Sequence, residues 1–213
     1  MVLKAALLDI DGTLVDSNDL HVKAWQAAFR RHGKEIPAEA LHAQMGKGGD
    51  LVVAEFLSEA ERRRCGKAIE DAHVEIFVRD FQPHERPLPG VRPLMQRFKA
   101  EGMRIVLATS AREEEIRAHL RVLQVDDLVD SRTGADDAGH SKPCPDLFEA
   151  ALGELRPQEA IVVGDSPWDA VAARKAGIPM LGVLTGGFRR EALLSRGASA
   201  VYSDLEELRE RWT

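Results

Sequence analysis

Apolar and polar residues follow two different patterns along this chain. Short, nearly continuous apolar runs that end in glycine or polar residues occur at the N-terminus and through the C-terminal half, and such runs are typical of buried strands. They predict strands at residues 2–8, 104–108, 160–164, 180–184 and 200–203. Helical patterns separate these runs, for example at residues 113–124 and 145–153. Because alternating strands and helices favour a parallel sheet covered on both faces, the sequence predicts an α/β fold with a doubly wound, mainly parallel, Rossmann-like sheet.

Residues 17–85 have a helical pattern instead, with apolar side chains three and four positions apart and no convincing strand. Ser17 and the two residues after it can cap the N-terminus of the first helix. The segment at the end of this region, FQPHERPLPG at residues 81–90, contains three prolines and is typical of a linker. We expect helices over about 17–32, 38–45, 50–57 and 58–80.

The two patterns divide the chain into two expected units. Residues 1–16 and 86–213 would form the α/β core, and residues 17–85 would form an all-helical cap domain inserted after the first strand. Sheets of this kind bind ligands beyond the carboxyl ends of their strands. A helical unit tethered beside that edge would therefore act as a lid that selects the substrate.

Composition and charge narrow the class of protein. The 29 basic and 35 acidic residues among 213 give a net charge of −6, and no basic stripe with interleaved aromatic residues indicates nucleic-acid binding. The N-terminal apolar stretch is interrupted by Lys4 and lacks a cleavage-like site, and no apolar run reaches membrane-spanning length. Cys65 and Cys144 lie too far apart to indicate a disulfide framework or a cysteine metal site. We expect a cytoplasmic monomer or dimer without a nucleic-acid or membrane partner.

The candidate chemistry begins at residues 9–16, which read DIDGTLVD directly after the first predicted strand. Asp9 and Asp11 are two positions apart, so in extended chain their carboxylates project to the same side and repel each other. A bound cation would relieve that repulsion, and oxygen ligands of this kind suit Mg²⁺. Taken alone, the same residues could simply form a turn before the next helix.

Polar residues also follow the later strands. Thr109 and Ser110 follow residues 104–108, where a hydroxyl and the backbone N–H groups at a helix start can bind an anion or simply cap the helix. Lys142, in the segment HSKPCPDLF, can hold a point charge over an anion or lie on the surface. Asp165 and Asp169 follow AIVVG. Because these groups meet at one edge of one sheet, together they indicate phosphoryl transfer, which depends on positioning and charge neutralisation.

The segments DIDGTLVD, LATS, SKP and VVGDSPWD, in that order, resemble the four motifs of the haloacid dehalogenase superfamily of phosphohydrolases. The helical insertion resembles the small α-helical (C1) cap of that superfamily, as in its phosphoglycolate phosphatase and β-phosphoglucomutase-like members. The C-terminal segment GGFRREALLSRGASAVYSDLEEL fits the closing strands and helix, so the resemblance spans the whole chain. The four motifs in this order are specific for the superfamily, whereas of the single motifs only the first is.

The resemblance implies a role for each residue. Asp9 would attack phosphorus and become an aspartyl-phosphate. Asp11 would protonate the leaving oxygen and later deprotonate the hydrolytic water. Mg²⁺ would be held by Asp9, the backbone carbonyl of Asp11 and Asp165, with Asp169 as a further ligand or a support. The phosphoryl oxygens would be bound by the hydroxyl of Thr109 (or of its neighbour), the N–H of Ser110 and the ammonium of Lys142.

Differences between this chain and three branches of the superfamily limit the reactions that we expect. Its dehalogenases and phosphonatases lack the second aspartate, so Asp11 argues against both, and Lys47 alone is weak support for the lysine that phosphonatases use. The β-phosphoglucomutases resemble the segment DIDGTLVDSNDLHVKAW, which includes His21. They carry an arginine in the cap loop and Glu-Asp in the fourth motif, where this chain has GKGGD and Gly164 before Asp165. Hydrolysis is therefore favoured over mutase chemistry.

We expect a Mg²⁺-dependent phosphomonoester hydrolase that acts on a small phosphorylated metabolite, of the phosphoglycolate or sugar phosphate type. A phosphosugar mutase and a catalytically silent binding module on the same fold are the alternatives. Residues 44–50, a glycine-rich cap loop, should contribute to specificity. Within the cap, Lys47 suits an anionic substrate group, and His21 could reach the mouth of the site. A histidine on a helix face is, however, more often a packing or solvated residue, and a lysine in a loop is usually a surface residue.

Overall fold

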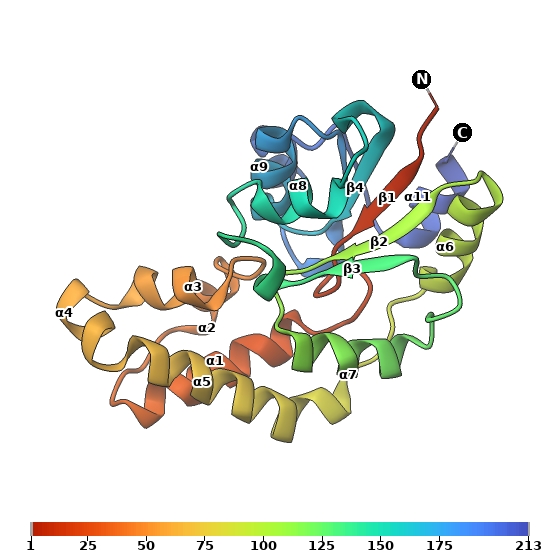
Figure 1. Cartoon of the computed structure of the whole chain (residues 1–213). Helices are drawn as coiled ribbons and strands as arrows, with labels where there is room; N and C mark the ends of the chain where they lie inside the picture. The colour runs from red at the N-terminus through yellow and green to blue at the C-terminus, as the bar shows by residue number, and fades with distance from the viewer. Residues whose placement is uncertain (1, 213) are drawn as a thin grey trace.

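Six parallel strands form one sheet in the structure, a computed structural model that describes residues 2–212 (Figure 1). The strand order is β3-β2-β1-β4-β5-β6, so β1 lies inside the sheet and pairs with both β2 and β4. This order confirms the doubly wound α/β fold. The strands are β1 Ala5–Leu8, β2 Arg104–Ala108, β3 Ser131–Thr133, β4 Ala160–Gly164, β5 Met180–Val183 and β6 Ala200–Tyr202.

All five strands expected from the sequence are present, with end shifts of a few residues at most. The strand that sequence reasoning missed is β3, which has three residues and pairs only with β2 at the edge of the sheet. Its sequence SRT contains no large apolar residue, and only Thr133 is buried. An edge strand that is buried at one position lacks the apolar run that identifies the others.

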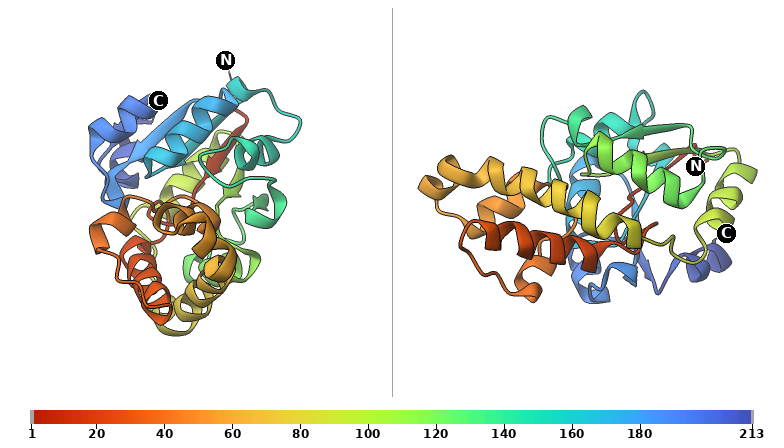
Figure 2. Two further views of the ribbon diagram at one scale, coloured as in Figure 1. Left: turned by 90° about the vertical axis from the view of Figure 1, so that its left-hand side faces the viewer. Right: turned by 90° about the horizontal axis from the view of Figure 1, so that it is seen from below.

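Helices cover both faces of the sheet (Figures 1 and 2). Successive residues of a strand face opposite sides, so in β1 Leu8 joins one apolar cluster and Leu7 the other. The first cluster includes apolar residues of α6 (Val91–Ala100), α7 (Glu113–Leu123) and α11 (Leu205–Arg211). The second includes residues of α8 (Asp146–Leu152), α9 (Pro167–Ala176) and α10 (Arg190–Arg196).

The inserted segment is all-helical and lies beside the end of the sheet where β1 finishes (Figure 1). Its long expected helix at 58–80 is a continuous helical run that includes two π-helical turns, Arg62–Gly66 and Phe77–Phe81. A third apolar cluster holds these helices together around Trp25, Phe29 and Phe77. The helices are α1 Asn18–Arg31, α2 Ala38–His42, α3 Gly49–Phe56, α4 Glu59–Glu61 and α5 Lys67–Ile76.

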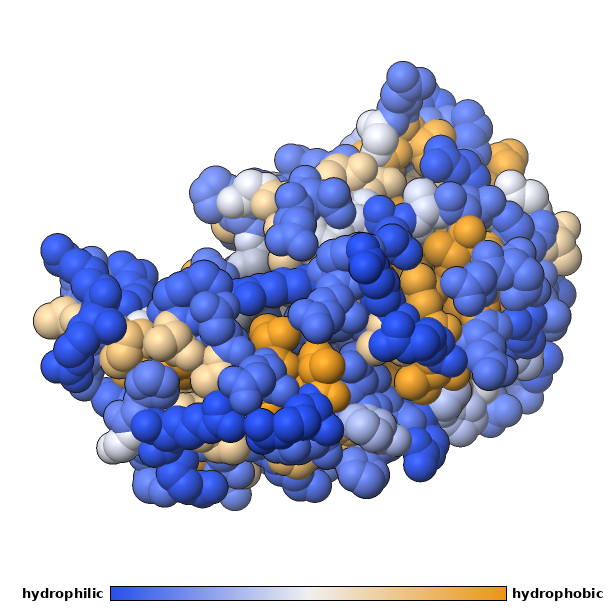
Figure 3. Space-filling view, turned by 60° about the horizontal axis from the view of Figure 1, so that its bottom comes forward, coloured by the Kyte–Doolittle hydropathy of each residue, from blue (hydrophilic) through white to orange (hydrophobic). Residues whose placement is uncertain are grey.

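Most large apolar side chains are enclosed in these three clusters. On the face shown in Figure 3 polar residues dominate, and apolar atoms are visible in smaller areas between them. Across residues 2–212, the large hydrophobic residues that are exposed are Val2 and Leu194. Within the same residues, no helix is long and apolar enough to cross a lipid bilayer.

Candidate active site

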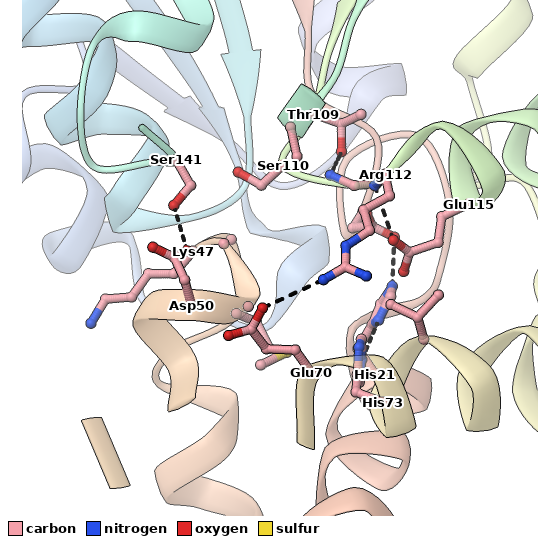
Figure 4. A pocket seen from close by; sticks show the side chains of 18 of the residues that line it. His21, Lys47, Asp50, Glu70, His73, Thr109, Ser110, Arg112, Glu115 and Ser141 are labelled. Carbon is pink, nitrogen blue, oxygen red and sulfur yellow. Dashed lines mark hydrogen bonds and ion pairs between the residues drawn. The ribbon is translucent and has the colours of Figure 1, made fainter. Parts of the chain in front are cut away.

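A cavity of about 300 Å³ lies between the helical insertion and the carboxyl ends of the strands (Figure 4). The insertion contributes residues of α1, α5 and the loop before α3 to its walls, and the core contributes the residues that follow β1, β2 and β3. Six of the expected site residues line the cavity, namely Asp9, Asp11, His21, Lys47, Thr109 and Ser110. The other three, Lys142, Asp165 and Asp169, are buried around Asp9.

Three carboxylates and one ammonium form the base of this site. Asp9, Asp165 and Asp169 each offer an oxygen within 4.8 Å of the others, and all three side chains are buried. The Nζ of Lys142 lies 2.5 Å from Oδ1 of Asp9 and 2.7 Å from Oδ1 of Asp169. Lys142 is fully buried, so it is no surface lysine. Four residues that the sequence places up to 160 positions apart are thus brought into contact distance.

The charges in this group do not balance, because one ammonium faces three carboxylates. Burial, together with repulsion from Asp169, raises the pKa of Asp9 to about 7 despite the attraction of Lys142. Burial and the same two aspartates raise the pKa of Asp165 well above its usual value. A cation would relieve both effects, and a set of carboxylate oxygens suits a hard divalent ion. These residues could therefore hold a metal ion.

Asp165 is held in place from the loop after β1. Thr13 donates its hydroxyl to Oδ1 of Asp165 at 3.0 Å, and Asn18 donates its amide to Oδ2 at 3.0 Å and to the carbonyl of Gly186 at 3.1 Å. Gly12, at φ +73°, lets the loop after β1 lie close to Asp165, since a Cβ at this position would be 2.4 Å from both Asn18 and Asp165. Thr13 and Asn18 are site residues that sequence reasoning missed, although Thr13 lies within the first motif.

Asp169 has two different contacts, one for each oxygen. Its Oδ2 accepts a hydrogen bond from the backbone N–H of Ser166 at 3.0 Å, while the Ser166 hydroxyl accepts one from the N–H of Asp169 at 3.2 Å. This reciprocal pair caps the N-terminus of α9. Its Oδ1 faces Lys142. Asp169 therefore orients the lysine, which favours the supporting role over direct metal ligation.

The carboxylate of Asp11 faces the helical insertion, away from the aspartate group. Its Oδ1 accepts a hydrogen bond from Ser17 at 2.6 Å and lies 3.0 Å from Nε2 of His21 and 3.5 Å from Nε2 of His119. Burial opposes ionisation, but His119 and His21 outweigh it and hold the pKa of Asp11 well below its usual range. Ser17 occupies the N-cap position of α1, yet its side chain accepts no capping bond from the helix, and its hydroxyl donates to Asp11.

Two further histidine contacts surround Asp11. Nδ1 of His119 lies 3.1 Å from Oε1 of Glu85, and both side chains are completely buried. Although burial lowers it, the charges of Asp11 and Glu85 raise the pKa of His119 to about 9. Nδ1 of His21 lies 3.2 Å from Nε2 of His73, and His21 stacks on the ring of Phe77. His21 thus reaches the site as expected, with its two nitrogens directed to Asp11 and His73.

The hydroxyls after β2 differ in their contacts. The Thr109 hydroxyl accepts a hydrogen bond from the N–H of Ala111 at 3.1 Å. The Ser110 hydroxyl is buried, has no hydrogen-bond partner among the described residues and lies at the cavity (Figure 4). Because a buried hydroxyl without a partner is costly, Ser110 is the better placed of the two to bind a ligand oxygen.

Two cations at the cavity wall already have partners in the protein. Nζ of Lys47 lies 2.5 Å from the amide oxygen of Gln44 and 4.1 Å from the centre of the Trp168 ring. The guanidinium of Arg112, which sequence reasoning missed, lies 3.1 Å from Asp71 and 3.4 Å from Glu70, across the cavity on α5 (Figure 4). The first cation after the LATS segment was the available clue to Arg112.

Comparison with known proteins shows the family of this chain. The family model described as haloacid dehalogenase-like hydrolase matches residues 3–177. The chain belongs to this family. It is 30% identical to a phosphoglycolate phosphatase from Rhodospirillum rubrum over 216 residues, which cover 96% of this chain and 89% of that relative. It is 29% identical to the validoxylamine A 7'-phosphate phosphatase of Streptomyces hygroscopicus over 212 residues, covering 97% and 96% of the two chains.

A solved structure is similar to this chain in its fold as well. The crystal structure of a hydrolase from Pseudomonas syringae superposes with a TM-score of 0.88 at 28% identity, covering 96% of this chain and 95% of that one. The similarity therefore includes the helical insertion as well as the core. The resemblance inferred from the four motifs is confirmed at the level of the family.

Proposed function

We propose that this family member is a Mg²⁺-dependent phosphomonoesterase that acts on a small phosphorylated metabolite, of the phosphoglycolate or sugar phosphate type. The observation that carries the proposal is the buried group of Asp9, Asp165, Asp169 and Lys142 at the base of a cavity between the insertion and the core. Relatives that match nearly the whole chain are named phosphatases. We also propose that residues 17–85 form the cap domain and that the rest of the chain forms the catalytic core.

In the proposed mechanism the carboxylate of Asp9 attacks phosphorus and displaces the alcohol, forming an aspartyl-phosphate that water then hydrolyses. Lys142, 2.5 Å from Asp9, keeps the nucleophile ionised and neutralises charge on the transferring group. Ser110 and Thr109 bind phosphoryl oxygens. When bound by Asp9, the Asp11 carbonyl and Asp165, Mg²⁺ would neutralise further negative charge.

Asp11 supplies the proton chemistry in this proposal. It donates a proton to the departing alcohol oxygen and takes one from the attacking water. In the structure Asp11 lines the cavity, and Ser17 and His21 hold its carboxylate there. Closure of the cap over the cavity would keep bulk water from the reacting atoms.

Asp9→Asn tests the proposal. Wild type should hydrolyse phosphomonoesters only with a divalent ion, and acid quenching during turnover should trap phosphate on the protein. Asp9→Asn should show neither turnover nor phosphate trapped on the protein. Asp16→Asn changes an exposed residue of the same motif and should retain both. Turnover by Asp9→Asn above trace wild type would rule out the covalent mechanism.

The two alternatives give different results in the same assay. A phosphosugar mutase would move phosphate between positions of a sugar phosphate with little release of inorganic phosphate. A silent binding module would bind phosphorylated metabolites without turnover in any metal. A panel of phosphorylated metabolites, scored by kcat/KM for phosphate release, separates these outcomes and identifies the substrate class.

A further inference from the structure

A buried pair of charged side chains lies where the helical insertion joins the core. Glu85 belongs to the segment that returns from the insertion, and His119 belongs to α7 of the core. Their side chains have no solvent exposure, and Nδ1 of His119 lies 3.1 Å from Oε1 of Glu85. None of their four polar atoms makes a well-formed hydrogen bond with the described residues. Such a pair is an expensive way to fill a core, and apolar residues of similar size would fill it at no such cost.

The pair is connected to the proposed acid/base residue. Nε2 of His119, the nitrogen that faces away from Glu85, lies 3.5 Å from Oδ1 of Asp11. The same oxygen accepts from Ser17 and lies 3.0 Å from His21. One carboxylate oxygen is therefore contacted from three places: the segment that enters the insertion, helix α1 of the insertion, and helix α7 of the core.

The two chain crossings between core and insertion run side by side at this point. The N–H of Asp16 donates to the carbonyl of Arg86 at 2.9 Å, and the N–H of Leu88 donates to the carbonyl of Leu14 at 2.8 Å. A movement of the insertion relative to the core must bend these paired segments. Glu85 directly precedes Arg86, so Glu85 moves when these segments bend. Because His119 contacts both Glu85 and Asp11, the same bend changes the surroundings of Asp11.

From this arrangement we infer that His119 and Glu85 are positioning residues for Asp11, which link the orientation of its carboxylate to the second crossing between core and cap. The inference rests on the proposed function, in which Asp11 transfers the proton. His119 touches no reacting atom. It fixes the orientation in which the Asp11 carboxylate meets the cavity, while its own orientation is set by Glu85, so His119 and Glu85 move together when the second crossing moves.

Proton donation matters most for poor leaving groups, so the effect of this pair should depend on the substrate. An alkyl phosphate needs Asp11 in place to protonate its leaving oxygen, whereas an aryl phosphate with an acidic phenol leaves without a proton. Loss of positioning should therefore lower kcat for the alkyl ester and leave the aryl ester nearly unchanged. A purely structural defect would lower both rates by the same factor.

The experiment compares His119→Gln, Glu85→Gln and the double variant with wild type, using glycerol phosphate and p-nitrophenyl phosphate in Mg²⁺. The ratio of the two kcat/KM values on one preparation cancels any loss of folded protein. We expect each single variant to lower the alkyl-to-aryl ratio by roughly 10-fold or more, a part of the roughly 10²–10⁴-fold that general acid catalysis contributes. The double variant should match His119→Gln, because Glu85 acts only through His119.

Met95→Ala is the matched control, since it removes a fully buried side chain from the apolar cluster that α7 shares and so destabilises the core without touching Asp11. It should lower yield or stability and leave the ratio at the wild-type value. An unchanged ratio in His119→Gln, or losses in the two single variants that multiply in the double, would overturn the inference. Failure of wild type to hydrolyse either ester would instead count against the proposed function.

Discussion

At the scale of single residues, the site is organised by charges that are buried before any ligand arrives. Asp9, Asp165 and Asp169 share one ammonium, and burial with mutual repulsion raises the pKa of Asp9 and of Asp165. The same features that make the group reactive toward a cation or a phosphoryl group lower the stability of the fold when neither is bound. Function and stability are therefore opposed at these positions.

This opposition predicts the behaviour of Asp165→Asn. Without metal, the variant should be more stable than wild type at pH 8, by on the order of 1–3 kcal/mol or roughly 2–10 °C in Tm, because one repelling charge is gone. Mg²⁺ should raise the Tm of wild type and have little effect on the variant. Thermal unfolding in EDTA and in Mg²⁺ measures both differences.

The pH dependence follows from the direction of the shifts. A carboxyl whose pKa is raised in the folded state destabilises the fold progressively as pH rises from its unfolded value, near 3.8, through its folded value, about 7 for Asp9. Metal-free wild type should thus lose stability between about pH 4 and 7, and the gain in Asp165→Asn should be smaller at pH 5 than at pH 8. An equal gain at both pH values would contradict this explanation.

At the scale of elements, the loop between α2 and α3 brings the helical insertion onto the core. The indole N–H of Trp168, in α9, donates to the carbonyl of Ala43 at 3.2 Å, and Lys47 lies over the same ring. Gly48 lets the loop approach closely, since a Cβ there would lie 2.3 Å from the hydroxyl of Ser141. These contacts make Lys47 part of the closure of the cavity, beside the substrate contact expected from its charge.

Two neighbouring glycines provide a matched test of this closure. Both tolerate alanine in their backbone conformation, but a Cβ at Gly48 collides with Ser141 of the core. One at Gly49 would make ordinary van der Waals contacts, with the Trp25 ring at 3.4 Å and Glu70 at 3.6 Å. Gly48→Ala should lower kcat/KM by about 10-fold or more, because small misplacements at an enclosed site are costly. Gly49→Ala should stay near wild type and stabilise α3 slightly.

A second substitution tests whether the collision itself is the cause. Ser141→Gly removes the two atoms nearest to the new Cβ and leaves Oδ1 of Asp50 at 2.8 Å, the end of a side chain that can rotate. Combined with Gly48→Ala, it should recover most of the lost kcat/KM relative to Ser141→Gly alone. Steady-state kinetics on the best phosphorylated substrate gives all four values. No recovery in the double variant would show that Gly48 is needed for another reason, such as loop flexibility.

At the scale of the whole molecule, three apolar clusters hold the chain together. Two lie on the faces of the sheet, and the third lies within the helical insertion around residues such as Phe29. The contacts between insertion and core include polar ones, such as His42 Nε2 at 3.0 Å from the carbonyl of Gly186, and the packing of Phe188 of the core against the third cluster. Because the insertion has its own apolar cluster, we expect it to unfold without disrupting the sheet.

Phe29→Ala and Phe98→Ala should separate the two units. Each removes a fully buried ring, at a cost of about 3–5 kcal/mol, but Phe29 belongs to the insertion and Phe98 to α6 of the core. Hydrogen exchange in Phe29→Ala should rise mainly in residues 17–85, while β1, β2 and β4 keep their protection. Phe98→Ala should increase exchange in the core strands. Uniform loss of protection in both variants would mean that the chain unfolds as one unit.

The sequence by itself determined the parts of this protein that depend on local pattern. Apolar runs identified every strand except the short polar β3, and helical spacing identified the insertion. Because parallel strands end at one edge, the same pattern predicts that Asp9, Lys142 and Asp165 lie together, as they do in the fold. The order of the motifs was sufficient to recognise the family.

Only the tertiary structure decided where side chains point once their element is in place. It turned Asp11 toward His21 and His119, directed Lys47 onto Trp168, and paired Arg112 with α5. Those directions depend on partners up to about 120 positions away, which no periodicity within a single element encodes. A strand end specifies which residues meet, but packing against the other elements specifies which atoms face one another.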